Sequence, residues 1–184
     1  SGATESDNLA ILGLVAFGEE KGKKHIISTA VEHKAVLEPL AVLEERGFDV
    51  TLISPNASGA IDAQQVVDVL REDTLLVSVM HVNNETGVCQ PVEEIAEALA
   101  GHAAFFHCDA AQGFGKDLVP LQNPRLDLIS ASGHKIYGPK GIGALIARRR
   151  RFRSPPLQPL MYGGGQERGL RPGTLPVPLI VGMG

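Results

Sequence analysis

Four groups of polar residues with chemically active side chains stand directly behind apolar runs of the chain. In chain order they are Glu32-His33, His81-Val82-Asn83-Asn84-Glu85, His107-Cys108-Asp109-Ala110-Ala111-Gln112 and Ser130-Ala131-Ser132-Gly133-His134-Lys135. An open parallel sheet binds its ligands outside the carboxyl ends of its strands. If the apolar runs are strands of such a sheet, the four groups meet at one edge, and we expect them to form one shared site.

Lys135 is the candidate nucleophile in these groups. It follows an apolar run and the small pair Ser132-Gly133, where partial burial would favour its neutral, nucleophilic amine. The other interpretation is an ordinary surface lysine at the end of a strand. The neighbouring His134 is likewise either a catalytic residue or a hydrogen-bonded structural residue, and the residues alone leave both questions open.

Asp109 and the first four residues suggest two further sites. Asp109 ends a run that should be buried, and a buried carboxylate needs a cationic partner such as a protonated pyridine nitrogen; the alternative is an N-cap. One side chain would not easily serve both purposes. Ser1-Gly2-Ala3-Thr4 precedes a helical pattern, so it forms either a phosphate site of backbone amides and a hydroxyl, or a plain helix cap.

The elements that must position these groups alternate between short β-branched runs and segments of helical period, which is typical of βαβ units. We predict an α/β fold with a mostly parallel sheet and helices on both faces. The predicted strands are residues 25–29, 50–54, 75–82, 104–108, 126–131 and 143–148. The predicted helices are residues 6–21, 34–46, 62–70 and 92–100. From Ser154 onward, many Pro and Gly residues predict an irregular surface loop.

Composition indicates one globular domain over residues 1–184, since 43% of the residues are hydrophobic and 21% are charged. A formal net charge of -4 gives no electrostatic reason to expect nucleic acid or an acidic membrane as a partner. No apolar run approaches the roughly 18 residues that a membrane span needs. The basic residues Arg148 to Arg151, with Arg153, are interpreted as a solvated strand end rather than a nucleic-acid site.

Cys89 and Cys108 lie in no Cys-x-x-Cys motif and near no His cluster at ligand spacing. We therefore expect no metal site and interpret both as small packing residues. The few cysteines and the absence of a signal-peptide pattern favour a cytoplasmic location. The chain has no initiating Met and ends on an apolar stretch that predicts the start of a helix, so we expect a fragment of a longer protein.

Six motifs together resemble the cysteine desulfurases, which belong to the class V aminotransferase group of pyridoxal 5'-phosphate (PLP) enzymes. The motifs are Ala3-Thr4-Glu5, Glu32-His33-Lys34, His81-Val82-Asn83-Asn84-Glu85, Asp109-Ala110-Ala111-Gln112, Ser132-Gly133-His134-Lys135-Ile136-Tyr137-Gly138-Pro139-Lys140-Gly141 and Arg171-Pro172-Gly173-Thr174. They keep their order and cover nearly the whole chain. The resemblance implies the large, PLP-binding domain of the aspartate aminotransferase-like fold, fold type I.

The resemblance also implies a role for each matching residue. Lys135 would hold PLP as a Schiff base and move the proton at the α carbon of the substrate, and His33 would stack on the ring, so both are expected to be catalytic. Asp109 would pair with the pyridine nitrogen. The remaining cofactor ligands would be Asn84 and Gln112 near the phenolic oxygen, Ala3, Thr4, Ser132 and His134 at the phosphate, and Thr174 at the phosphate of the other subunit of a homodimer.

The activity that the resemblance implies is the conversion of L-cysteine to L-alanine, with the sulfur passed as an enzyme persulfide to an acceptor protein, for example in iron-sulfur cluster biogenesis. Neither Cys89 nor Cys108 matches the catalytic cysteine of the family, which lies in a later segment, as does the arginine for the substrate carboxylate. We therefore expect this fragment to be inactive alone. Pro172 stands where Ser is expected, which removes a hydroxyl and a backbone donor.

Two other functions stay open. One is another class V enzyme on the same core, such as a selenocysteine lyase or a small-amino-acid aminotransferase; Glu32-His33 favours the desulfurase. The other is a dimerisation module that has kept the fold and lost catalysis. The joint presence of Lys135, Asp109, Gln112 and His33 speaks against that second interpretation.

Overall fold

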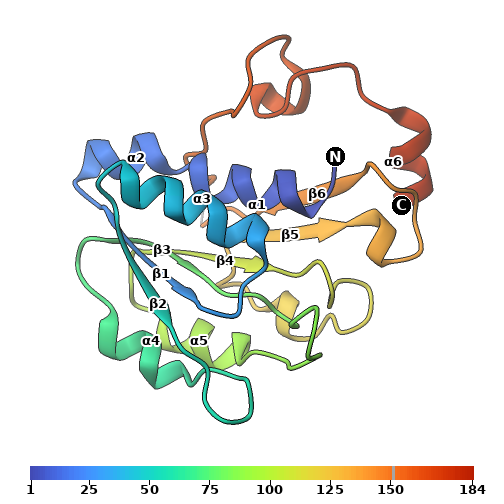
Figure 1. The fold of residues 1–184 in the computed structure, drawn as a ribbon. Coiled ribbons are helices and arrows are strands. Elements are labelled where there is room, and N and C mark those ends of the chain that lie inside the picture. The colour runs from blue at the N-terminus through green and yellow to red at the C-terminus, as the bar shows by residue number, and fades with distance from the viewer. Residues whose placement is uncertain (151) are drawn as a thin grey trace.

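The computed structural model describes residues 1–150 and 152–184, which form a sheet between two layers of helix (Figure 1). The sheet has six strands in the order β2-β1-β3-β4-β5-β6. Strands β1 to β5 are parallel, and β6 runs antiparallel to β5. The strands are β1 His25–Thr29, β2 Asp49–Ile53, β3 Thr74–Ser78, β4 Phe105–Asp109, β5 Leu128–Ser132 and β6 Gly143–Ala147. The predicted mostly parallel α/β fold is confirmed.

Helices cover both faces of the sheet, as predicted (Figure 1). One face carries α1 (Ala3–Leu12), α2 (Val15–Lys21) and α3 (Lys34–Glu45), and the other carries α4 (Ala63–Val69) and α5 (Val92–Ala98). Each face has its own buried apolar layer. Strands β1, β3 and β5 are buried along their whole length, which explains why they read as continuous apolar or small-residue runs.

The single helix predicted over residues 6–21 is wrong, because the structure has two helices that meet at Gly13 and Leu14. The carbonyl of Gly13 accepts a hydrogen bond of 2.8 Å from the amide of Gln158. A Cβ atom at position 13 would lie 3.1 Å from the carbonyl oxygen of Gln158, so the C-terminal segment passes against the helix at a residue without a side chain. The break therefore depends on a tertiary contact that local periodicity does not contain.

Strand β3 ends at Ser78, before the predicted end at residue 82. The amide of Met80 donates a hydrogen bond of 2.8 Å to the carboxyl group of Glu32. A side chain from the loop after β1 thus replaces the backbone partner that a longer strand would need. This replacement brings Glu32 into the sheet at the edge where the polar groups gather.

The interpretation of the basic run as a solvated strand end is wrong for two of its members. Arg148 donates hydrogen bonds of 2.6 and 2.5 Å to the carbonyl oxygens of Leu121 and Asn123. Arg150 binds both carboxylate oxygens of the buried Asp127, at 2.5 and 2.6 Å. The two arginines therefore anchor the end of β6 to the neighbouring loop, and Arg151 lies outside the described residues.

The segment after Ser154 is irregular, as predicted, with one short 3-10 helix at Gln166–Gly169. The predicted helix start near the end of the chain is α6, Val177–Met183. No helix within residues 1–150 and 152–184 is long and apolar enough to cross a membrane.

Candidate active site

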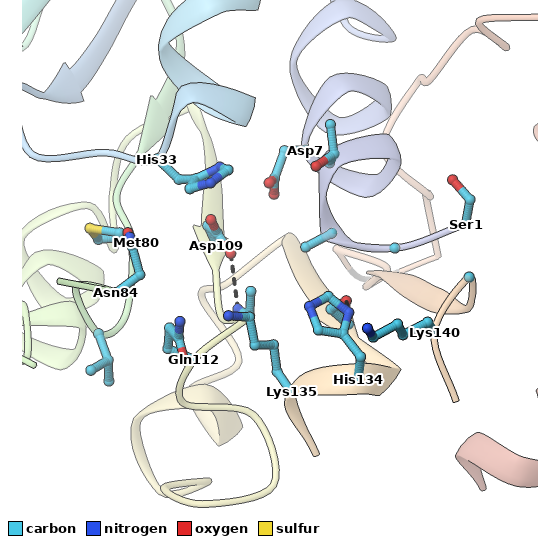
Figure 2. A pocket seen from close by; sticks show the side chains of 17 residues that line it. Ser1, Asp7, His33, Met80, Asn84, Asp109, Gln112, His134, Lys135 and Lys140 are labelled. Atoms are coloured by element: carbon cyan, nitrogen blue, oxygen red, sulfur yellow. Dashed lines mark hydrogen bonds between the residues drawn. The ribbon is translucent and has the colours of Figure 1, made fainter. Parts of the chain in front are cut away.

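A cavity of about 560 Å³ opens at the carboxyl ends of the parallel strands, beside the start of α1. Its walls come from the first turn of α1, from the loops after β1, β3 and β4, and from the turn after β5 (Figure 2). The predicted site residues that line it are Ala3, Thr4, His33, Asn84, Asp109, Gln112, Ser132, His134 and Lys135. Residues that are far apart in the sequence therefore meet at one sheet edge, as strand topology requires.

Asp109 ends β4 and is 5% exposed. One of its carboxylate oxygens accepts a hydrogen bond of 2.9 Å from the amide of Ala111, and the side chain faces the cavity (Figure 2). Burial is the main reason that the pKa of Asp109 is raised to about 6, and the nearby carboxylate of Asp7 adds to the effect. One oxygen therefore holds the turn after β4, and the same side chain lines the cavity.

Lys135 closes a short 3-10 helix, Gly133–Lys135, that follows β5 directly. Its side chain is half-buried and extends into the cavity between Gln112 and His134 (Figure 2). A Cβ atom at Gly133 would lie 2.8 Å from Cγ2 of Ile142, so the tight turn requires glycine there. Lys135 therefore lies at the end of a strand, as both interpretations required, with its side chain in the cavity.

The start of α1 offers free backbone amides to the cavity. Its N-cap residue, Gly2, makes no side-chain capping hydrogen bond. Nearby, the hydroxyl of Ser132 lies 2.9 Å from Nδ1 of His134. Backbone amides at a helix N-terminus together with hydroxyl and imidazole groups suit an anion such as a phosphate. The plain capping interpretation of residues 1–4 is therefore wrong in this structure.

His33 is the N-cap residue of α3, and its Nδ1 accepts a hydrogen bond of 3.0 Å from the amide of Ala35. This bond holds the imidazole ring above the cavity, near Asp109 (Figure 2). It also fixes Nδ1 as the nitrogen without a proton. The ring is therefore presented to the cavity in a defined orientation.

Thr174 is the one predicted site residue that does not line the cavity; it is exposed in the C-terminal segment. That segment is joined to α1 through Arg171, whose Nε donates a hydrogen bond of 2.7 Å to Glu5. The hydrogen bond from Arg171 lowers the pKa of Glu5 to about 2. The C-terminal segment is thus joined to the helix whose first turn lines the cavity.

The sequence interpretation missed Asp7, Met80 and Lys140, which also line the cavity. Asp7 lies one helical turn after Ala3, so the two share a face of α1. The prediction began this helix at residue 6, which hid that relation. A helix start at Ala3 would have placed Asp7 in the site.

Comparison with known proteins agrees with the geometry. The family model for aminotransferase class-V matches residues 1–184. The chain is 55% identical over 185 residues to a protein named cysteine desulfurase IscS from Pectobacterium carotovorum, covering 100% of this chain and 45% of that protein. It is 52% identical to a mitochondrial cysteine desulfurase from Eremothecium gossypii, covering 100% of this chain and 37% of that protein.

Solved structures show the same relation. DndA from Streptomyces lividans has a TM-score of 0.97 at 59% identity, over 100% of this chain and 52% of that chain. A structure described as SspA in complex with cysteine has a TM-score of 0.88 at 51% identity, over 99% of this chain and 52% of that chain. The chain thus spans about half the length of the relatives it matches. The fold, the order of the motifs and the family match together show that this chain belongs to the class V aminotransferase family.

Proposed function

We propose that these residues form the PLP-binding part of a cysteine desulfurase, which converts L-cysteine to L-alanine and passes the sulfur on as an enzyme persulfide. The observation that carries the proposal is that Lys135 and the buried Asp109 face one cavity whose wall includes the uncapped start of α1. The names of the relatives at 52–55% identity support the choice of substrate.

The residues around the cavity fit PLP in their chemistry. Asp109 offers a buried carboxylate oxygen to a cationic ring nitrogen, and the turn of α1 with Ser132 and His134 offers donors to a phosphate. When bound, PLP supplies a conjugated ring that withdraws electrons from the α carbon of an amino-acid substrate. We assign the cofactor-binding roles to the lining residues Ala3, Thr4, His33, Asn84, Asp109, Gln112, Ser132, His134 and Lys135.

Three of these residues carry the proposed chemistry. Asp109 holds a proton at the ring nitrogen, because its buried carboxylate is stable as an anion only beside a cation. His33 would lie over the ring. Lys135 is the amine that would hold the cofactor, and its place in the cavity would let it take and return a proton at the α carbon of the substrate as a general acid and base.

Neither cysteine of the chain is placed to take the sulfur. Burial is the main reason that the pKa of the Cys108 thiol is raised well above its ordinary value, and the charge of the neighbouring Asp109 adds to the effect. The thiol is therefore a poor nucleophile. Cys89 is exposed and does not line the cavity. We therefore propose that residues 1–184 bind the cofactor without completing turnover and that the persulfide forms on a cysteine outside them.

Two proposals concern partners. Thr174 is exposed and lies away from the cavity of its own chain, which supports a homodimer in which it reaches the phosphate in the other subunit. A sulfur-acceptor protein would complete the reaction. A cytoplasmic location stays a prediction, since relatives include bacterial, mitosomal and mitochondrial proteins.

The cofactor assignment is tested by absorption spectroscopy. Purified protein incubated with PLP should show the visible band of a lysine-bound cofactor, and Lys135→Ala should abolish that band. Lys116→Ala, which changes an exposed lysine outside the cavity, is the matched control and should keep it. An unchanged spectrum in Lys135→Ala would contradict the assignment. Sulfide and alanine production from L-cysteine by the complete gene product tests the desulfurase activity separately.

A further inference from the structure

Asp7 is a fully buried carboxylate in the inner wall of the cavity. Neither of its oxygens has a hydrogen-bond partner among the described residues. Nε2 of His107 lies 3.4 Å from Oδ1 of Asp7. The two atoms are within ion-pair distance, but the contact is not a hydrogen bond. A buried carboxylate without donors is costly unless a cation compensates it.

His107 is also fully buried, in the middle of β4. Its Nδ1 lies 2.8 Å from the hydroxyl of Ser78, and its Nε2 lies 3.0 Å from the hydroxyl of Ser130. Side chains two residues apart in a strand share a face, so His107 and Asp109 both point toward α1. Asp7, His107 and Asp109 are therefore three ionisable groups in one buried layer beneath the cavity.

The geometry restricts the protonation of His107. If Nε2 carried no proton, its lone pair would stand 3.4 Å from a carboxylate oxygen of Asp7, and the two would repel. A proton on Nε2 can be donated to the hydroxyl of Ser130, 3.0 Å away, and it places positive charge beside Oδ1 of Asp7. The hydroxyl of Ser78 can accept a second proton from Nδ1, so both nitrogens have an acceptor within reach.

The other polar groups around Asp7, His107 and Asp109 add no further charge to this buried layer. Glu32, from the loop after β1, accepts hydrogen bonds from the hydroxyl of Thr29 and the amide of Met80. Burial, opposed by those hydrogen bonds, raises the pKa of Glu32 to about 8, so its carboxyl group is neutral at pH 7. The neighbouring strands contribute the uncharged Ser78 and Ser130. His33 and Lys135 stand on the cavity side, where the ligand is expected.

We propose that Asp7 and His107 form a buried carboxylate-imidazolium pair, and that this pair leaves Asp109 as the single uncompensated negative charge beneath the cavity. The proposal rests on the proposed function for its ligand, since one cation, the ring nitrogen of PLP, then neutralises the layer. With a neutral His107, two buried carboxylates would share that one cation. Asp7 and His107 are in this sense positioning residues that act through Asp109.

The charge count predicts a specific pattern in a double-mutant cycle of the complete protein. In His107→Gln the two neighbouring buried carboxylates, Asp7 and Asp109, share a proton, so Asp109 is less often the anion that a cationic ring nitrogen needs, and the dissociation constant for PLP should rise by about tenfold or more. Asp7→Asn removes the charge that holds the imidazolium and should change the constant by less. The double variant Asp7→Asn with His107→Gln restores the balance and should bind PLP more tightly than His107→Gln alone.

A purely structural role predicts the opposite order, because two cavities or lost contacts would make the double variant the weakest binder. His25→Gln is the matched control: His25 is also buried between two hydroxyl groups, those of Thr74 and Thr51, but it lies at the other end of the sheet. His25→Gln should leave the dissociation constant for PLP unchanged. Adding Asp7→Asn to His25→Gln should not make PLP bind more tightly. A double variant that binds PLP no better than His107→Gln would overturn the proposal.

A second measurement needs no cofactor. The ¹⁵N chemical shifts of histidine-labelled, cofactor-free protein distinguish an imidazolium from a neutral imidazole. At pH 7 we expect His107 to be an imidazolium in the unmodified protein and neutral in Asp7→Asn. A neutral His107 in the unmodified protein, or an imidazolium that persists in Asp7→Asn, would refute the ion pair. Failure of the unmodified protein to bind PLP would instead refute the proposed function.

Discussion

Replacement of Glu32 by Gln should stabilise the protein, and more so as the pH rises. Glu32 is 6% exposed, and one of its oxygens, Oε2, has no hydrogen-bond partner among the described residues. Gln keeps an acceptor for the hydroxyl of Thr29 and the amide of Met80, which donate to Oε1 at 2.8 Å each. The variant therefore reproduces the shape of the protonated carboxyl group but cannot ionise.

The magnitude follows from proton linkage. Burial raises the pKa of Glu32 from 4.5 to about 8 in the folded protein. Between these values the folded state holds a proton that the unfolded state has lost, so the stability contributed by this group falls as the pH rises. At about 1.36 kcal/mol per pKa unit, the cost to the free energy of unfolding is roughly 1 kcal/mol at pH 5 and roughly 3 kcal/mol at pH 7. The advantage of Glu32→Gln should therefore grow by about 2 kcal/mol across that interval.

The assay is urea unfolding of cofactor-free protein followed by circular dichroism at pH 5, 6, 7 and 8, with equal protein concentrations for every sample. Glu38→Gln is the matched control, since it makes the same chemical change at an exposed position of α3. Its stability should run parallel to that of the unmodified protein. A Glu32→Gln advantage that is constant with pH, or that turns into a deficit toward pH 8, would refute the neutral buried carboxyl group.

Two further predictions concern the turn before Lys135 and the tie between the C-terminal segment and α1. Gly133→Ala should destabilise the protein by about 1–3 kcal/mol and reduce PLP binding in an absorption titration, because the new methyl group meets Ile142 at 2.8 Å. Gly101→Ala, where the methyl group meets open space, is the control and should be near neutral. Arg171→Ala should lower the free energy of unfolding by less than about 1 kcal/mol, since solvent screens the partly exposed ion pair of Arg171 and Glu5. The hydrogen bond from Arg171 lowers the pKa of Glu5 to about 2, so the pair contributes fully to stability above about pH 4.5 and loses that contribution as the pH falls toward 2. The melting temperatures of the unmodified protein and of Arg171→Ala should therefore become equal in acid.

The sequence predicts most of the sheet because the signal there is local. Strand β1 begins and ends at the predicted residues, because its β-branched residues favour an extended backbone and all five of its side chains are buried. The site was found for a similar reason: polar residues behind buried strands must gather at one edge. The motif that contains Lys135 then identified the family.

What the sequence did not predict depends on contacts between distant segments. Gly13 ends a helix because the backbone at Gln158 passes against it, and Arg150 is held by the buried Asp127. Neither partner is visible in a local pattern. Asp7 was missed for a smaller reason, the placement of a helix start three residues too late, which moved it from the second turn of the helix to the first.

Helix α1 packs on the strands β4, β5 and β6, although it is the first element of the chain and they are the last strands. Contacts of this kind have high sequence separation, and they form slowly because a long loop must close first. During synthesis α1 is made before these strands, so the face of the helix that packs on them stays exposed until β5 and β6 have been synthesised. The start of α1 and Lys135, which follows β5, therefore come together late, when the last strands have joined the sheet.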